Sequence, residues 1–521
     1  MALKELEGKI YVSDYNESVN KSLSLPQKVR IFDTSLRDGE QLPGVTYRGE
    51  DKIEIARALD KLGVDIIEAG FPVNSEGELA TAKKISSLGL KSKVCGLARA
   101  ITKDIDACIQ ADVEIVHTFI STSDIHLKYQ MNKTREQVYE EAVTAVEYSK
   151  SHGFKTLFSA MDASRTEPNY LIKVFNGAVG AGADIINVPD TVGVMHPPAM
   201  RELIKRIRNE VKVPIDVHCH NDFGLAVANS LAAVEAGADG VQVSMNGLGE
   251  RAGNASLEQI VMSLHCLYGV RTGVKTERLY ETSKLIERLS EVTLPPFQPI
   301  VGSTAFAHES GIHAHAVLKH ASTFEPMLPE LVGQKRNIVI GKDSGKASIE
   351  VALRQLGFEV GDAKLLMRIV ERIKEVSLAK KRIYNEDIRA IASDVLGKGK
   401  RKALVELDEF VVTTGNKIKP SATLKIKFKG DTVESKGIGV GPVDATAKAL
   451  EAAFPKRKLK LVEYNLRAIT GGTDALADVE VKVEVNGKPY IGHAVDGDIV
   501  MASVNAMVRA LDESLAMQSK E

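Results

Sequence analysis

The stretch Gly182-Ala183-Asp184 ends a segment with helical spacing, Asn169–Ala181, and opens a short β-branched run, Asp184–Val188. The same phrase returns as Gly63-Val64-Asp65 and as Gly237-Ala238-Asp239. Glycine suits the left-handed conformation in which many helices end. The repeated phrase therefore predicts a chain built from alternating helices and strands.

Eight short runs of this kind lie in the first half of the chain. They are Val29–Thr34, Asp65–Ala69, Lys93–Leu97, Glu114–Phe119, Lys155–Ser159, Asp184–Val188, Ile215–His220 and Gly240–Ser244. Segments with helical spacing lie between them, such as Glu50–Leu62, Arg135–His152, Asn169–Ala181 and Gly224–Ala236. Alternating β and α units predict a parallel sheet with right-handed crossovers. Eight units fit a closed (β/α)8 TIM barrel, an α/β fold. An open doubly wound sheet of six strands is the alternative, and it would leave two units over.

Length, charge and cysteine content limit the class of protein. A chain of 521 residues is expected to hold two or three domains. The 68 basic and 69 acidic residues balance, which predicts neither a nucleic-acid partner nor an anionic membrane surface. The four cysteines form no CxxC pair, and the first residues resemble no secretory signal. No apolar run is long enough to span a bilayer, so we expect a cytoplasmic protein with reduced thiols.

In a barrel of this kind the chemistry lies at the carboxyl ends of the strands. Polar residues gather there in nearly every candidate strand. In chain order they are Arg37 and Asp38, Glu68, Arg99, His117, Asp162 and Arg165, Asp190 and Thr191, His218 and His220, and Glu250 and Asn254. A single polar residue at a strand end is more often structural than functional. Their presence at so many ends predicts an active site.

Two histidines indicate which chemistry this site performs. His218 and His220 end an apolar run two residues apart, so on a strand both face one point while Cys219 faces away. Asp38 follows the first candidate strand. A carboxylate and two imidazoles that meet at one end of a barrel suit a divalent metal ion.

Three motifs together resemble a known superfamily. They are Asp33-Thr34-Ser35-Leu36-Arg37-Asp38-Gly39-Glu40-Gln41, His218-Cys219-His220-Asn221-Asp222 and Asn246-Gly247-Leu248-Gly249-Glu250-Arg251-Ala252-Gly253-Asn254. In this order they resemble the DRE-TIM metallolyases, and within them the group of 2-isopropylmalate, homocitrate and citramalate synthases. The resemblance covers residues 28 to about 515. It implies an acyltransferase that condenses acetyl-CoA with a 2-oxo acid in a Claisen-type reaction and then hydrolyses the thioester.

The resemblance also assigns roles to individual residues. It implies a divalent cation, left open among Mn, Mg, Zn and Co, on the ligands Asp38, His218, His220 and Asn254. Arg37 is expected beside the developing enolate oxygen, and an ion pair with a neighbouring strand-end carboxylate is its alternative role. The loop of Glu250 is expected to approach a ligand closely, and the alternative is that it is only a tight turn that closes the barrel. Catalytic roles are implied for Arg37, His308 and Glu250, and substrate contacts for Thr191, Arg165 and His117.

Beyond the barrel the sequence pattern changes twice. We expect an N-terminal arm at 1–28, the catalytic barrel at 29–293, a linker and helical subdomain at 294–402, and a C-terminal domain at 403–521. The basic run Gly397–Lys402 is the expected hinge before the last domain. In the family the subdomain reaches over the barrel mouth, and the resemblance makes His308 an acid or base there. Four histidines between 308 and 320 leave a second metal site as an alternative.

The C-terminal segment combines strand-like runs with two helices. The runs are Leu404–Thr413, Ala422–Phe428, Leu459–Ile469 and Asp478–Val485, and the helices are Ala445–Ala453 and Ile499–Leu511. Each helix follows a glycine-rich phrase and has an aspartate near its start, which is a good cap. This crude repeat resembles the α+β regulatory domain of 2-isopropylmalate synthases. It implies a homodimer and feedback binding of an amino acid, leucine, with a purely structural role in dimerisation as the alternative.

Smaller resemblances bear on the 2-oxo acid. Phe71-Pro72, Cys95–Ala100 and His117–Ile120 are similar to the 2-isopropylmalate branch. They make 3-methyl-2-oxobutanoate the expected substrate and leucine biosynthesis the expected pathway, with pyruvate and 2-oxoglutarate as alternatives. The group usually has Glu where this chain has Met161 and Tyr where it has Phe324. Because neither side chain here transfers protons, a regulatory paralogue that condenses nothing is a further alternative.

Overall fold

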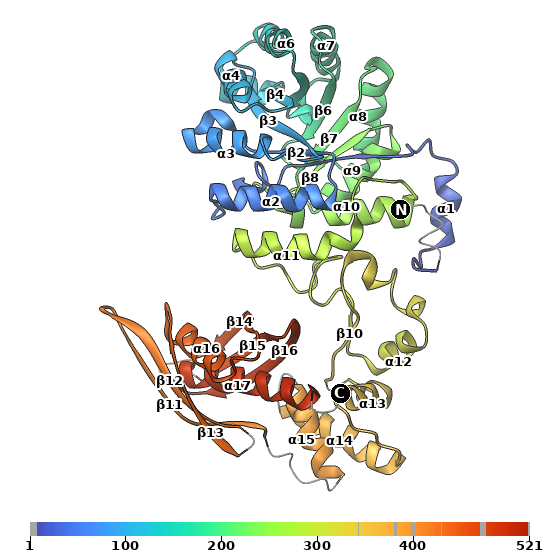
Figure 1. Cartoon of the computed structure of the whole chain (residues 1–521). Helices are drawn as coiled ribbons and strands as arrows, with labels where there is room; N and C mark the ends of the chain where they lie inside the picture. Colours follow the sequence, from blue (N-terminus) through green and yellow to red (C-terminus); the bar gives the residue numbers. More distant parts are fainter. Residues whose placement is uncertain are drawn as a thin grey trace. The chain divides into compact units, whose positions relative to one another are not determined.

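The computed structural model describes residues 8–341, 343–379, 383–396, 403–428, 430–468 and 476–518. The chain divides into two compact units, Met1–Val339 and Ile340–Glu521, and each is described by itself (Figure 1). The division falls inside the segment 294–402, which the sequence assigned to one linker and subdomain. The expected hinge at 397–402 lies outside the described residues.

Eight parallel strands close the first unit into a barrel. They are β1 (Arg30–Asp33), β2 (Ile66–Glu68), β3 (Lys93–Arg99), β4 (Ile115–Ser121), β5 (Lys155–Met161), β6 (Ile185–Asp190), β7 (Ile215–Cys219) and β8 (Gly240–Val243). Each strand pairs with the next along the chain, and β8 pairs with β1. Every predicted strand matches one of these to within two residues at each end. The (β/α)8 prediction is confirmed, and the open sheet is excluded.

Helices follow the strands and cover the outside of the barrel (Figure 1). They are α2 (Gly49–Leu62), α3 (Glu76–Ser86), α4 (Thr102–Gln110), α6 (Arg135–Ser151), α7 (Pro168–Gly180), α8 (Pro197–Glu210), α9 (Ala226–Glu235), α10 (Leu257–Ser263) and α11 (Leu279–Ser290). Gly63, Gly182 and Gly237 each have φ between 95° and 105°. The repeated phrase thus marks a left-handed turn from helix to strand, as predicted.

The aspartate of that phrase fixes the start of a neighbouring strand. Asp65 Oδ2 accepts a hydrogen bond from the backbone N–H of Ile31 over 2.9 Å, at the start of β1. The equivalent aspartates bond the starts of β5 and β7 in the same way, over 2.8 Å each. Each phrase therefore ends a helix and also aligns two adjacent strands of the barrel.

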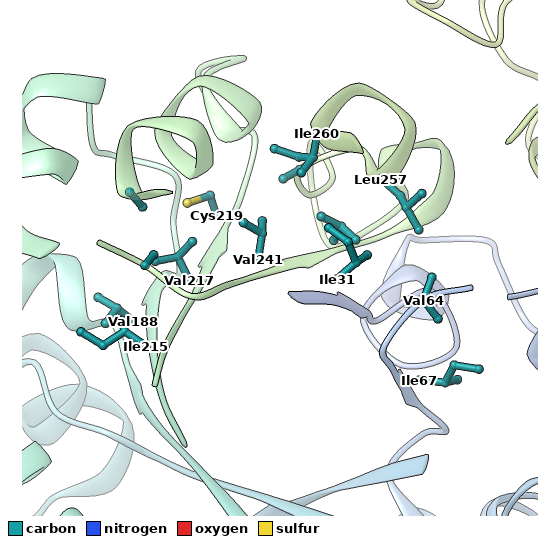
Figure 2. Packing of buried hydrophobic residues seen from close by; sticks show 14 of the residues in the cluster. Ile31, Val64, Ile67, Val188, Ile215, Val217, Cys219, Val241, Leu257 and Ile260 are labelled. Atoms are coloured by element: carbon teal, nitrogen blue, oxygen red, sulfur yellow. The ribbon is translucent and has the colours of Figure 1, made fainter. Parts of the chain in front are cut away.

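Residues along each strand alternate between two apolar cores. One core fills the barrel interior and consists of Phe32, Ile66, Cys95, Ile115, Leu157 and Ile185. The other lies between the barrel and its helices and includes Val217, Cys219, Val241 and Ile260 (Figure 2). Because Cys219 belongs to the outer core, the side chains on either side of it face the barrel interior, as predicted.

The N-terminal arm and the residues after α11 also belong to the first unit. The arm, expected to be irregular, contains the helix α1 (Asp14–Asn20), and Asn20 Nδ2 donates to the Leu267 carbonyl over 2.8 Å. Residues 294–339 include β9 (Ala307–His308), α12 (Gly311–Lys319) and β10 (Asn337–Ile338), with β9 parallel to β10.

The second unit holds three helices and a duplicated domain. The helices α13 (Lys346–Gln355), α14 (Ala363–Ala379) and α15 (Asn385–Val395) come first. The sheet of β11 (Val405–Gly415), β12 (Ile418–Phe428) and β13 (Asp431–Ile438) precedes α16 (Pro442–Ala453). The sheet of β14 (Leu459–Ala468), β15 (Ala477–Val485) and β16 (Lys488–Asp496) precedes α17 (Ile499–Gln518). Among the described residues, no helix of either unit is both long and apolar enough to cross a bilayer.

The repeat noticed in the sequence is thus a βββα unit used twice. Two of its strands, β13 and β16, were not predicted, because β13 is mostly polar and β16 contains Pro489 and Gly492. Pairing with β12 and β15 holds them in place. Gly437 of β13 lies against the backbone of α16, and Gly492 of β16 lies against the backbone of α17. A Cβ at either glycine would collide with that backbone, so both helices pack unusually close to their sheets.

Candidate active site

The site begins where the chemistry of the barrel interior changes. Residues two positions beyond the interior core face the same side of their strands. On β2 to β6 these positions hold Glu68, Leu97, His117, Ser159 and Asn187, and β7 and β8 add the paired residues His218 and Gln242. Six of the seven are polar. A polar layer therefore lies directly above an apolar one, at the carboxyl ends of the strands.

A cavity of about 260 Å³ lies at this layer. Its apolar lining comes from Phe71, Leu97, Phe119, Met161 and Pro189, and its polar lining includes Arg37, Asp38, His117, Ser159, Asn187, Thr191, His218, His220, Gln242, Glu250 and Arg251. A larger hollow of about 680 Å³ lies between α2 and α11, outside the barrel, and contains none of the predicted site residues. The smaller cavity is the candidate active site.

Asp38, His218 and His220 meet there as the sequence predicted. Their ligand atoms all lie within 4.8 Å of one another. His218 Nε2 lies 3.2 Å from Asp38 Oδ2 and 3.2 Å from His220 Nε2. All three side chains are buried. Two imidazole nitrogens and a carboxylate at these separations resemble the donor set of a divalent metal site.

Orphaned polar atoms support the same conclusion. Asp38 Oδ1 and Asn254 Oδ1 are buried and have no hydrogen-bond partner among the residues that the structure describes. Asn254 lies opposite His220 in an isolated antiparallel bridge, so it is next to the cluster. His218 Nδ1 lies 3.0 Å from Gln242 Oε1, and with its proton on Nδ1 the ring leaves Nε2 free for a ligand. The residues present therefore fit a divalent cation.

The charges of the cluster suit a cation as well. Burial and the neighbouring His218 lower the pKa of His220 to about 3, so this ring is neutral at pH 7. Burial alone would raise the pKa of Asp38, but Arg37 and the two imidazoles outweigh it and hold that pKa well below its usual value. A neutral imidazole and an ionised carboxylate are the protonation states in which these groups bind metals.

Arg37 links this cluster to the polar layer. Its Nη1 lies 2.6 Å from Asp38 Oδ2 and its Nε lies 2.6 Å from Glu68 Oε2. Glu68 Oε1 in turn lies 2.6 Å from His117 Nδ1, and His117 Nε2 lies 2.7 Å from Ser159 Oγ. The ion pair weighed as an alternative role for Arg37 therefore does form. Arg37 lines the cavity all the same, so the pairing fixes its guanidinium there.

The predicted residues fall into two sets. Arg37, Asp38, His117, Thr191, His218, His220 and Glu250 line the cavity, and Asn254 lies beside it. Arg165 and His308 do not line it. The guanidinium of Arg165 contacts Asp162, with Nε 2.8 Å and 3.0 Å from the two carboxylate oxygens. In this structure the partner of Arg165 is therefore a carboxylate of its own chain, and its contact with substrate stays a prediction.

His308 lies in β9, outside the cavity. Its Nε2 is 3.2 Å from Glu325 Oε1, and Glu325 also receives two 2.6 Å hydrogen bonds from Arg336. No described residue of 294–339 lines the cavity, so within one chain this segment does not cover it as expected. Among the described residues, groups that could hold a metal ion are formed by Asp38, His218 and His220 and by Glu68, Cys95 and His117, and the histidines of α12 belong to neither group.

The two departures from the family lie in different places. Met161 ends β5 and lines the cavity. Phe324 is 46% exposed and stacks on His313, with ring centroids 4.0 Å apart. Sequence reasoning assigned no role to Ser159, Asn187 or Gln242, although all three line the cavity. The available signal was a polar residue two positions beyond an inward apolar residue of a barrel strand.

Comparisons with known proteins agree with this geometry. Three family profiles match the chain: HMGL-like at residues 28–286, homocitrate synthase post-HMGL domain-like at 300–381, and LeuA allosteric (dimerisation) domain at 382–515. The chain is 53% identical to a 2-isopropylmalate synthase of Methanocaldococcus jannaschii, over 98% of this chain and 100% of the relative. It is 52% identical to a probable 2-isopropylmalate synthase of Archaeoglobus fulgidus, over 95% and 98%. It is 46% identical to an (R)-citramalate synthase of Methanocaldococcus jannaschii, over 93% and 99%. The chain therefore belongs to the 2-isopropylmalate synthase family of the DRE-TIM enzymes.

Proposed function

We propose that this enzyme condenses acetyl-CoA with 3-methyl-2-oxobutanoate to give 2-isopropylmalate and CoA, the chemistry of leucine biosynthesis. The observation that carries the proposal is the cluster of Asp38, His218 and His220 beside Arg37, in a cavity with an apolar wall. The higher identity to 2-isopropylmalate synthases than to citramalate synthases supports the choice of 2-oxo acid.

The residues of the cluster have two roles, metal binding and stabilisation of negative charge. Asp38, His218, His220 and Asn254 would hold a divalent cation. When bound, such a cation would act as a Lewis acid that polarises the ketone of a 2-oxo acid, which can chelate a divalent metal. Arg37 presents a guanidinium to the same cavity, where it stabilises the negative charge that develops on an enolate oxygen. Burial would lower the pKa of Arg37, but Glu68 and Asp38 raise it above its usual value, so the guanidinium keeps its charge.

The rest of the lining favours a small apolar substituent. Phe71, Leu97 and Phe119 give the cavity an apolar wall that suits an isopropyl group. The 2-oxoglutarate of homocitrate synthases carries a second carboxylate, which needs a cation. The cations in the lining are Arg37 and Arg251, and both already pair with carboxylates of the protein. The lining therefore supports the branched 2-oxo acid over 2-oxoglutarate.

The second unit supports a regulatory role. Its two βββα repeats coincide with the match to the LeuA allosteric (dimerisation) domain. We therefore propose that the enzyme is a homodimer and that an amino-acid effector, leucine, binds to this domain. The cytoplasmic location remains a prediction from the sequence.

A thiol-release assay tests the substrate. The metal-supplied enzyme is given acetyl-CoA with 3-methyl-2-oxobutanoate, pyruvate or 2-oxoglutarate, and free CoA is measured. We expect kcat/KM to be highest for 3-methyl-2-oxobutanoate, by about 10- to 200-fold or more over pyruvate, because even one methylene group in an apolar pocket discriminates on this scale.

The other outcomes of this assay reassign the protein. Preference for pyruvate makes it a citramalate synthase, and preference for 2-oxoglutarate makes it a homocitrate synthase. No CoA release with any 2-oxo acid supports the regulatory paralogue. His218→Ala is the control variant, and we expect it to lose turnover and bound metal together. Undiminished activity in His218→Ala would remove the proposed site.

A further inference from the structure

Asp162 is the residue at which three loops of the barrel mouth meet. It follows β5, is fully buried, and adopts φ 65° and ψ 36°. This left-handed conformation is uncommon outside glycine, although aspartate and asparagine tolerate it better than other residues. Strained backbone of this kind gathers at functional sites, where the surrounding structure holds it.

The carboxylate of Asp162 holds this turn in place. Ser123 Oγ, from the loop after β4, donates to Asp162 Oδ2 over 2.5 Å. Arg165 Nε lies 2.8 Å and 3.0 Å from the two carboxylate oxygens. The backbone carbonyl of Asp162 accepts from Thr166 Oγ1 over 2.9 Å. His126 Nδ1 lies 3.9 Å from Asp162 Oδ2.

The turn points the backbone N–H of Asp162 at Thr191, which follows β6. This N–H donates to Thr191 Oγ1 over 2.9 Å. Arg251 Nη2 donates to the carbonyl of Thr191 over 2.9 Å, and Arg251 itself is bound to Asp222. Thr191 is therefore fixed through its side chain and its backbone.

These contacts determine which way the Thr191 hydroxyl donates. Thr191 lines the cavity, and its hydroxyl oxygen already accepts a hydrogen bond from the backbone N–H of Asp162. Within the part of the chain that the structure describes, no protein group accepts the hydroxyl hydrogen of Thr191. A hydroxyl whose oxygen accepts from the protein is left with its O–H to donate, and Thr191 is a residue of the cavity lining.

We propose that Asp162 is a positioning residue whose left-handed turn orients the Thr191 hydroxyl as a hydrogen-bond donor to the carboxylate of the 2-oxo acid. This inference rests on the proposed function, because it requires a 2-oxo acid in the cavity. It concerns only the carboxylate that all 2-oxo acids share, so it does not depend on which of them is the substrate.

Variants at Asp162 separate the turn from the charge. Asp162→Asn removes the charge but keeps a residue that tolerates the left-handed region, and Asp162→Gly keeps the turn without any side-chain contact. Asp162→Val opposes the turn, because a β-branched residue is a genuine outlier at positive φ. Asp112→Val is the matched control, since Asp112 has φ 55° and lies in an exposed turn away from the cavity.

We expect Asp162→Val to raise KM for the 2-oxo acid about 10- to 100-fold, the scale of one hydrogen bond to a charged group. KM for acetyl-CoA should change less than about threefold. Asp162→Asn should raise KM for the 2-oxo acid less than about threefold, Asp162→Gly should fall between, and Asp112→Val should leave both KM values unchanged. Equal effects of Asn and Val, or parallel losses in both KM values, would overturn the proposal.

A double-mutant cycle with Thr191→Val tests the connection. If Asp162 acts through the Thr191 hydroxyl, Asp162→Val adds less than about threefold to KM once that hydroxyl is gone. If the effects of Asp162→Val and Thr191→Val on KM instead multiply in the double variant, Asp162 does not act through Thr191. If Asp162→Val does not fold, by circular dichroism, the cycle is run with Asp162→Gly and the same criteria.

The same KM measurements distinguish a failure of the proposed substrate from a failure of the proposed role of Asp162. Each KM is measured with the 2-oxo acid that the unmodified enzyme prefers. A preference for pyruvate overturns the proposed substrate but leaves the predicted pattern at Asp162 and Thr191 intact. An enzyme that turns over no 2-oxo acid is examined by calorimetric titration with 3-methyl-2-oxobutanoate, and absence of binding there overturns both proposals.

Discussion

Individual residues of the site are held in place by neighbouring side chains to which the sequence analysis gave no catalytic or binding role. Glu68 fixes both Arg37 and His117, and Gln242 fixes His218. In the first case burial would raise the pKa of Glu68, but the charges of Arg37 and His117 lower it below its usual value. Such partners set the orientation and the protonation state of the groups that bind substrate or metal.

The contact between Gln242 and His218 leads to a prediction about metal affinity. Gln242→Leu removes the acceptor opposite His218 Nδ1, so the ring loses the partner that fixes its orientation. We expect the dissociation constant of Mn²⁺ or Zn²⁺, measured by competition with a chelator, to rise about 10- to 100-fold. Asn187→Leu is the control, because Asn187 lies in the same layer but bonds Ser159 instead of a candidate ligand. Equal affinities in the two variants would contradict this role.

A histidine outside the site predicts how stability depends on pH. His265 Nε2 accepts a hydrogen bond from the backbone N–H of Thr272 over 3.1 Å. Burial lowers the pKa of His265 to about 4, whereas an unfolded chain titrates near 6.5. The unfolded state therefore binds the proton first, and the stability present above pH 6.5 is lost as pH falls toward 4.

His265→Gln isolates this contribution. The glutamine can accept the same hydrogen bond but does not titrate. Between pH 7.5 and pH 5 we expect the free energy of unfolding of the variant to fall by about 2 kcal/mol less than that of the unmodified protein. Urea unfolding at both pH values measures the difference. Parallel losses in the two proteins would show that His265 is not protonated on unfolding.

At the scale of elements, the short phrase Gly-x-Asp explains why the barrel could be predicted from the sequence. Its glycine ends a helix and its aspartate bonds the start of an adjacent strand. The effect of the glycine is local, so it is visible in the sequence. The hydrogen bond of the aspartate to the neighbouring strand appears only in the structure. The missed strands β13 and β16 lack such a signal, because their partners β12 and β15 stabilise them through pairing.

The close packing of β16 on α17 leads to a prediction about the C-terminal domain. At Gly492 a Cβ would collide with the backbone of α17, whereas at Gly497 nothing lies within 4 Å of one. We expect Gly492→Ala to destabilise this domain by about 1–3 kcal/mol, the usual cost of overpacking, and Gly497→Ala to have little effect. Hydrogen exchange of the α17 amides measures both. Equal protection in the two variants would contradict the contact.

At the scale of the whole molecule, the second unit is larger than the C-terminal domain expected from the sequence. The ring of Tyr384, just before α15, stacks on His493 of β16 with centroids 3.8 Å apart. Arg389 of α15 pairs with Glu513 of α17 over 3.1 Å. A truncation at the expected hinge, near residue 399, would remove the regulatory domain but would also separate α15 from the β16 and α17 residues that it contacts. Point substitutions are the better test of regulation.

Feedback inhibition is predicted for the full chain. We expect leucine to lower the rate of CoA release by the unmodified enzyme and by Gly497→Ala. Gly492→Val should weaken that inhibition at least about tenfold, because a larger side chain displaces α17 from its sheet. Dose–response curves at fixed substrate measure the effect. Inhibition of equal potency in Gly492→Val would contradict a role of this domain in regulation.

The metal-like part of the candidate site could be predicted from the sequence, because the two-residue period of a strand sets the direction of its side chains. Asp38, His218 and His220 follow strand ends in motifs whose side-chain direction is set by the strand period, so their meeting point could be inferred. Arg165 also follows a strand, but its direction depends on Asp162, whose backbone turn no pattern announces. Ser159 and Gln242 were missed because a polar residue inside a strand has meaning only when its inward direction is known.

The sequence by itself determined the eight alternating units, the left-handed helix ends and the metal-like motif, because each depends on local conformation or on the two-residue period of a strand. Tertiary structure alone decided which polar residues share the cavity and which pair with one another. It turned Arg165 toward Asp162, placed His308 against Glu325, and joined α15 to the second unit. The last two contacts join segments that are far apart along the chain, and the first depends on a backbone turn that Ser123 of a neighbouring loop helps to hold, so their geometry is fixed only when the fold has closed.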